Sequence, residues 1–169
     1  MVAFDRDDLN RVDWALFQNG WVTMYWKPEV LDRDTAWLVD RGYRAYNFDC
    51  SRWSSAAVAL RDLGEVLGFP DYYGQNLDAF NDCLSDLEVP IEGGVVVVLR
   101  RYDRFAAVAP PVAQALLDIL ATNARRFMLF GQRLATLIQS DDPELSFEPV
   151  GSTPVTWNRQ EWANAARGV

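Results

Sequence analysis

The feature that most constrains the fold is a run of β-branched and aliphatic residues, Val95-Val96-Val97-Val98-Leu99, which follows Pro90 and Gly93-Gly94. All five side chains are apolar, so both faces of the segment have to be buried. Strands that are buried on both faces occur in parallel sheets with helices packed on each side. The run therefore predicts a parallel strand inside an α/β domain.

Strand and helix patterns alternate along the chain before this run. Residues 21–26 and 43–48 are rich in strand formers. A helix is expected between them, within residues 28–41, with Gly42 as its stop. The alternation predicts an α/β fold in which a parallel sheet of three or four strands packs with helices in a small three-layer arrangement.

The amino-terminal part has a second interpretation. Asn19-Gly20 has the composition of a tight hairpin turn, which would join a strand at 14–17 to the strand that begins at Trp21. The sequence does not decide between this hairpin and a helix-connected unit.

Capping residues mark the later helices. Ser54 or Ser55 can cap a helix that runs to about Leu67. A short helix is expected at 102–108, and a longer one at 111–126 that begins with a proline. We place the next strand at 127–130, where four large apolar residues stand together. Asn158 and Glu161 have the spacing of a capping box, which predicts a last helix to about Arg167.

Composition limits the chemistry of the chain. Its 169 residues include no histidine, which removes Ser-His-Asp and Cys-His catalysis and histidine-ligated metal sites. Neither GxxxxGK nor GxGxxG occurs. Two cysteines, Cys50 and Cys83, are too few for a disulfide scaffold and are interpreted as reduced buried thiols. We expect a protein that is not an enzyme and that holds neither metal nor cofactor.

The sequence also indicates where in the cell the protein is found. The longest aliphatic run has five residues, whereas a membrane helix needs about 20. Acids follow Met1 almost at once, and no apolar segment typical of a secretory signal peptide comes after them. We therefore expect a cytoplasmic protein without a membrane span.

Negative charge is concentrated in one segment. The formal net charge is −8, and no Lys or Arg occurs between Arg61 and Arg100. Such a segment repels the phosphates of nucleic acids and attracts basic protein surfaces, although acidic stretches often serve only solubility. Direct nucleic-acid binding is not expected. The segment contains eight acids: Asp62, Glu65, Asp71, Asp78, Asp82, Asp86, Glu88 and Glu92.

Within this segment, helical geometry sorts the residues that follow Asn76, the expected N-cap. At 3.6 residues per turn, Leu77, Phe80, Leu84 and Leu87 share one side, which has to face the core. Asp78, Asp82 and Asp86 then form a ladder on the water-facing side, one turn apart. Like charges at this spacing cost about 0.2–0.5 kcal/mol per pair. A ladder that is unfavourable by itself indicates a cationic partner, and its spacing of roughly 6 Å resembles that of successive phosphates.

The residues from Gly68 to Leu84, GFPDYYGQNLDAFNDCL, closely resemble the signature of the barstar family, the intracellular inhibitors of barnase-type ribonucleases. The resemblance covers residues 43–131 and implies the small barstar α/β fold there. Residues 1–42 would be an amino-terminal α/β extension packed on the core, and residues 132–169 a carboxy-terminal extension.

The resemblance also implies roles for individual residues. Asp78 and Asp82 stand at the two helix acids that enter the ribonuclease active site, and Tyr72 at the loop aromatic that packs over it. Asn76 matches the cap and Cys83 a buried helix cysteine. Tyr73 and Gly74 are expected to be structural, with Gly74 supplying a positive φ.

The sequence departs from the family pattern at two helix positions. Asn81 replaces a large aromatic residue between the helix acids. The acid expected on the last long helix falls on Thr122, and Asp118 is a candidate substitute one turn earlier.

Three functions follow from these residues. The favoured one is a non-catalytic inhibitor of a basic ribonuclease or nuclease toxin, which contacts its partner through Asp78, Asp82, Asp86, Tyr72, Asn76 and Asn81. The alternative is an interaction module of the same fold with a different partner. A carboxylate-based hydrolase is least favoured, because exposed helix carboxylates lack the burial that would equip one of them as a general acid.

Overall fold

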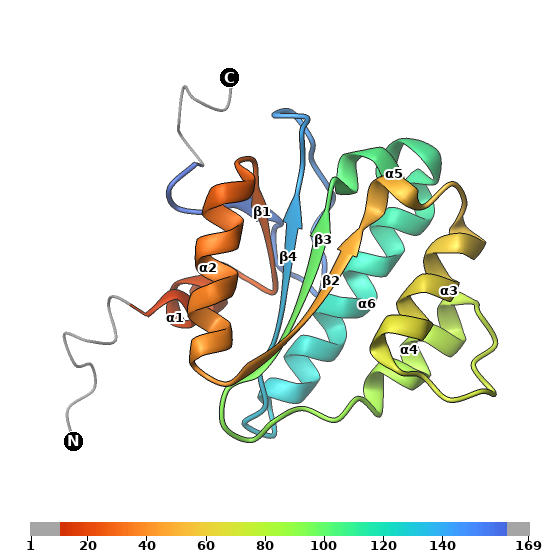
Figure 1. Ribbon diagram of the computed structural model, residues 1–169, viewed down its shortest axis with the longest axis horizontal. Coiled ribbons are helices and arrows are strands. Elements are labelled where there is room, and N and C mark those ends of the chain that lie inside the picture. Colours follow the sequence, from red (N-terminus) through yellow and green to blue (C-terminus); the bar gives the residue numbers. More distant parts are fainter. Residues whose placement is uncertain (1–10, 162–169) are drawn as a thin grey trace.

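The computed structural model describes residues 11–161 and contains a five-stranded parallel sheet in the order β2-β3-β4-β1-β5 (Figure 1). The α/β class with a parallel sheet is therefore confirmed, with five strands instead of the three or four expected. The strands are β1 (Val22–Tyr25), β2 (Tyr43–Asp49), β3 (Gly94–Arg100), β4 (Leu134–Gln139) and β5 (Thr156–Trp157).

Helices cover both faces of this sheet, which gives three layers (Figure 1). One face carries α1 (Val12–Gln18) and α2 (Pro28–Asp40). The other face carries α3 (Ala56–Leu67), α4 (Leu77–Ser85), α5 (Tyr102–Val108) and α6 (Pro110–Met128), and a 3-10 turn, η2 (Cys50–Arg52), follows β2. No helix among the described residues is long and apolar enough to cross a bilayer.

The valine run behaves as its composition predicts. It forms β3, which pairs with β2 on one side and β4 on the other. Its side chains alternate between two cores: Val95, Val97 and Leu99 pack under α3–α6, whereas Val96 and Val98 pack under α1 and α2. Each side chain is at most 1% exposed. The sheet thus has a hydrophobic core on each face.

Local signals place most helix ends correctly. Ser55 accepts a hydrogen bond from the Val58 amide and begins α3, and α2 begins with a proline in its first turn. Gly42 (φ +89°) follows α2, and Gly68 (φ +73°) ends α3 in the left-handed region that favours glycine.

Two expectations about chain segments are wrong. The hairpin alternative fails because residues 12–18 form α1. The strand expected at 127–130 is instead the end of α6 and the turn after it. The apolar stripe of α6 continues through Ala124 to Phe127, so the helical pattern persists. The Gln132 amide then donates to the Phe127 carbonyl at 3.0 Å, and the following strand is β4, at 134–139.

The carboxy-terminal part contributes to the sheet and to a distant helix. The Asn158 and Glu161 side chains hydrogen-bond to each other at 2.6 Å, but the reciprocal capping box is not formed, because the Asn158 side chain accepts from the Gln160 amide and its backbone amide donates to the Met24 carbonyl. The Glu161 carboxylate accepts from the amides of Trp26 and Lys27, where α2 begins. The helix expected to reach Arg167 lies outside the described residues.

The segments on either side of residues 43–131 share one side of the sheet. The first supplies β1, and the second supplies β4 and β5, which pair with β1 on its two sides. The opposite edge strand is β2, and α3 and α4 lie on that side of the molecule (Figure 1).

Candidate partner-binding surface

The acidic helix, α4, begins as its sequence predicts. The Asn76 side chain accepts a hydrogen bond from the Ala79 amide at 2.8 Å and caps the helix. Phe80 and Leu84 are fully buried against the core, in which α4 packs on α6 and α3. The buried side of α4 therefore fixes the direction of its opposite side.

That opposite side carries the three expected carboxylates. Asp78, Asp82 and Asp86 are all exposed, and no Lys or Arg among residues 11–161 forms an ion pair with them. Asp78 lies in the first turn, where the helix dipole favours an acid, but Asp86 is the C-cap, where the dipole disfavours one. Within residues 11–161, therefore, no basic side chain compensates this ladder.

The loop that leads into α4 holds its two tyrosines differently. Tyr73 is turned inward, where its hydroxyl donates to the Leu60 carbonyl at 3.0 Å and its ring packs edge-on against Phe69. Burial raises the pKa of Tyr73 to about 12. Tyr72 is 82% exposed. The loop thus anchors itself with one tyrosine and presents the other beside the acidic helix.

The positive φ of this loop lies one residue later than expected. Gln75 has φ 51°, whereas Gly74 has no positive φ. A Cβ atom at Gly74 would stand 3.2 Å from the Asn76 side-chain nitrogen, so close approach to the helix cap is the constraint at this glycine.

Two of the three residues linked to departures from the family pattern, Asn81 and Asp118, make hydrogen bonds within the chain. Asn81 is exposed, but its side-chain oxygen accepts from buried Asn123 of α6 at 2.9 Å. Asp118 accepts from the Gly151 amide at 2.9 Å and so holds the carboxy-terminal segment. Thr122 is exposed. Asn123 was missed at the sequence level, because only the packing of α6 on α4 brings it to Asn81.

The two cysteines differ in burial. Both are free, and Cys50 is buried as expected, whereas Cys83 is only half-buried, so the expectation of a buried thiol is wrong there. Burial, and then the charges of Asp82 and Asp86, raise the pKa of the Cys83 thiol. No group of three or more Cys, Asp or Glu side chains in residues 11–161 is arranged to hold a metal ion.

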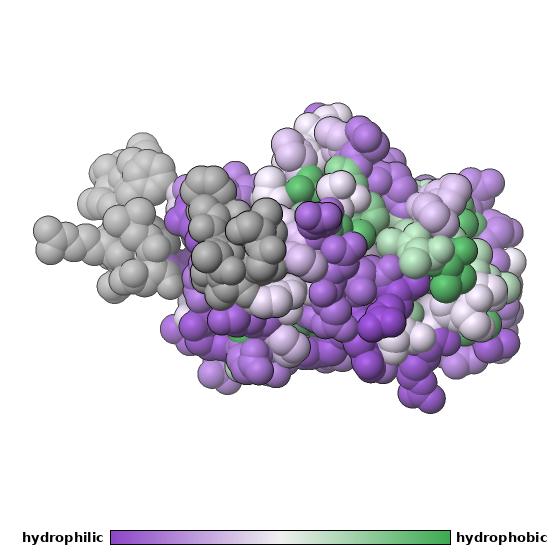
Figure 2. Space-filling view, turned by 90° about the horizontal axis from the view of Figure 1, so that it is seen from above, coloured by the Kyte–Doolittle hydropathy of each residue, from purple (hydrophilic) through white to green (hydrophobic). Residues whose placement is uncertain are grey.

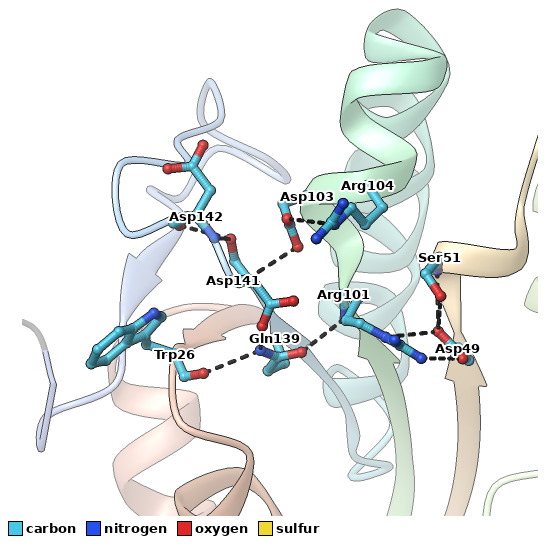
Figure 3. Close-up of polar contacts among 10 residues, drawn as sticks. Trp26, Asp49, Ser51, Arg101, Asp103, Arg104, Gln139, Asp141 and Asp142 are labelled. Atoms are coloured by element: carbon cyan, nitrogen blue, oxygen red, sulfur yellow. Dashed lines mark hydrogen bonds and ion pairs between the residues drawn. The ribbon is translucent and has the colours of Figure 1, made fainter. Parts of the chain in front are cut away.

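A second polar cluster lies at the carboxyl ends of the strands, where open α/β sheets commonly bind ligands. Gln139, 2% exposed, accepts from the Arg101 amide at 2.9 Å and donates to the Trp26 carbonyl and the Asp141 carboxylate (Figure 3). Arg101, with φ 52°, turns its guanidinium to Asp49. These contacts join the ends of β1, β2, β3 and β4.

This cluster satisfies its own polar groups. Asp103 accepts from the Asp141 amide and pairs with Arg104 (Figure 3). Seen from above, this end of the molecule is largely hydrophilic, with hydrophobic residues in small separate groups (Figure 2). The cluster thus links the strand ends to one another, whereas the carboxylates of α4 have no ion-pair partner among the described residues.

Fold and surface together define a three-layer α/β protein whose acidic helix, unpaired within the described part of the chain, lies beside an exposed tyrosine. The chain belongs to the barstar family: the family model described as Barstar (barnase inhibitor) matches residues 43–139, which include β2, α3, α4, β3, α5, α6 and β4.

Two individual proteins give partial matches. The Bacillus subtilis (strain 168) protein named "Putative ribonuclease inhibitor YrdF" is 44% identical over 43 residues, which span 25% of this chain and 43% of that protein. Among solved structures, the Walker-type ATPase PABY2304 of Pyrococcus abyssi has a TM-score of 0.46 at 14% identity. That likeness covers 82% of this chain and 45% of the ATPase chain, and it carries no functional argument.

Proposed function

We propose that this chain is a non-catalytic inhibitor of a basic ribonuclease, either barnase-like or a nuclease toxin, and that it blocks the enzyme's active site. The observation that carries the proposal is the row of exposed carboxylates on α4 beside Tyr72, which form no ion pair with any residue in 11–161. Membership of a family described as barnase inhibitors supports it.

In this proposal the contact residues have different tasks. Asp78 and Asp82 meet the cationic groups that the enzyme uses for RNA phosphates, and Asp86 extends the row. Tyr72 covers the rim of the enzyme site. Asn76 holds the helix start in place, and Asn81 lies between the acids. Because RNA phosphates carry the same sign of charge as α4, the chain would compete with RNA and not bind it.

The direct test is binding to barnase, with inhibition of RNA hydrolysis as the second readout. Loss of a hydrogen bond to a charged group costs about 1.5–3 kcal/mol, so Asp78→Ala and Asp82→Ala should each weaken binding about tenfold or more. Asp40→Ala removes the same charge from an exposed site at the end of α2, on the other face, and is the matched control. Circular dichroism checks that each variant is folded.

Equal binding by wild type and both α4 variants would contradict the proposal. One observation then favours the alternative, an interaction module with a different partner: Asn81 is held by Asn123, so the position between the acids is tied to α6.

A further inference from the structure

A cavity of about 250 Å³ lies next to α4, between edge strand β2, the loop after α3 and the residues that follow α4. Sites for drug-sized ligands are typically about 300–1,000 Å³, so this cavity is suited to one long side chain. Six of its lining residues matter here: Tyr46, Phe69, Tyr72, Asp86, Leu87 and Glu88.

The chemistry of the lining selects the kind of side chain. Aromatic and aliphatic groups form the walls, and two exposed carboxylates, Asp86 and Glu88, stand among them. Arg44 is the single base among the described residues that line the cavity. It hydrogen-bonds Tyr46 and is attracted to Glu88, and the two acids still outnumber it. A guanidinium can stack on tyrosine rings and bind two carboxylates at once, whereas an ammonium is a compact, strongly hydrated charge.

The cavity is continuous with the surface proposed above. Tyr72 and Asp86 belong to both, since each lines the cavity and each lies beside or on the exposed side of α4. A protein seated on Asp78 and Asp82 therefore reaches the mouth of the cavity without any movement of this chain.

We propose that the cavity between β2 and α4 receives an arginine side chain of the bound ribonuclease, with Asp86 and Glu88 as its carboxylate partners and Tyr72 as its stacking surface. The inference rests on the proposed function and adds a second, specificity-determining anchor to it. In this arrangement the acids of α4 attract the enzyme, and the cavity selects enzymes that carry an arginine at the matching position.

The first test measures how fast barnase dissociates from the double variant Asp86→Asn/Glu88→Gln. The matched control, Asp40→Asn/Glu92→Gln, removes the same two charges at exposed positions outside the cavity. Loss of a contact made in the complex raises the dissociation rate, whereas loss of distant charge mainly slows association. We expect about tenfold faster dissociation for the cavity variant only, equivalent to loss of one charge-assisted contact.

The second test identifies the side chain. Each exposed arginine of barnase is replaced by alanine and measured against wild type and the cavity variant. For at least one arginine, replacement should speed dissociation from the wild-type chain about tenfold and dissociation from the cavity variant only slightly. Equal dissociation rates for cavity variant and control, or no coupled arginine, would overturn the inference while the proposed function stands. No loss of binding with Asp82→Ala, or no binding by wild type, would overturn the proposed function and the inference with it.

Discussion

Tyr73 lies so close to Gly64 that a Cβ atom on the glycine would come within 2.5 Å of the tyrosine Cε1 atom. Gly64 lies in the last turn of α3, and Tyr73 is the anchored tyrosine of the loop that presents Tyr72. A glycine inside a helix thus sets the position of the candidate binding loop.

Substitution Gly64→Ala should therefore destabilise the protein. Overpacking against the tyrosine ring costs about 1–3 kcal/mol, which exceeds the roughly 0.5–1 kcal/mol that alanine gains over glycine inside a helix. Chemical denaturation measures the difference. In a Tyr73→Ala background the clash is absent, so there Gly64→Ala should become stabilising; destabilisation in both backgrounds would show that another contact excludes the methyl group.

Asp34 makes a pH-dependent contribution to stability. It lies buried in α2, where its carboxylate accepts from the Tyr25 hydroxyl at 2.7 Å, and burial raises its pKa above the ordinary value of 3.8. Because the folded pKa exceeds the unfolded one, the contribution of Asp34 is fully present below pH 3.8. It is lost as the pH rises through the folded pKa.

Substitution Asp34→Asn keeps this position neutral at every pH. We expect the variant to be more stable than wild type at pH 7 and the advantage to shrink as the pH falls toward 3.8, in thermal melts across that range. Asp40→Asn, at an exposed position of the same helix, should change stability by less than about 0.5 kcal/mol. An advantage of Asp34→Asn that grows on acidification would reverse the assigned sign.

Glu161 stabilises the start of α2 from the far end of the described chain. It is 2% exposed and accepts from the Trp26 amide at 2.8 Å and the Lys27 amide at 2.9 Å. Glu161→Ala leaves both amides without this acceptor, so we expect a loss of about 1.5–3 kcal/mol. Hydrogen exchange at α2 amides should rise more than at α4 amides; uniform protection changes would argue against a local capping role.

The end of α6 provides a test of the helix that replaces the expected strand. Phe127 is 7% exposed and packs in the core, whereas Phe130 is 77% exposed. Phe127→Ala should cost about 3–5 kcal/mol, and Phe130→Ala no more than about 0.5 kcal/mol. Urea denaturation of the two variants makes the comparison, and similar large losses would instead fit a buried strand at 127–130.

The dependence of binding rates on salt tests whether charge attraction speeds association with the enzyme. The acids of α4 are exposed, so the Debye length, about 10 Å at 0.1 M salt and about 3 Å at 1 M, screens their attraction for a basic enzyme. Association with barnase should slow as salt rises, while the dissociation rate changes little. Stopped-flow mixing at several NaCl concentrations measures both, and an association rate independent of salt would remove charge steering from the proposal.

Much of the fold could be predicted because the signals are local. The cap at Asn76, the cap of α3 at Ser55 and the continuous apolar run of β3 each depend on residues within a few positions of one another. The acidic row of α4 follows from helical periodicity alone, and the structure leaves all three carboxylates exposed.

The errors have a common origin in contacts that the local pattern does not contain. The tetrapeptide at 127–130 is apolar enough for a strand, yet it follows a helix whose buried stripe still extends to Phe127. Glu161 has capping-box spacing with Asn158, yet besides bonding the Asn158 side chain its carboxylate accepts from the two amides just before α2. In each case a partner distant in sequence or a preceding element decides the conformation.

The sequence by itself determined the α/β class, most of the helices with their caps, and the side of α4 on which its acids lie, because periodicity and capping act over single turns. Only the tertiary structure decided the order of the five strands, the hydrogen bond between Asn81 and Asn123, and the cavity that adjoins Tyr72 and Asp86. These depend on which surfaces exclude water together, and that choice is made between segments far apart in the chain.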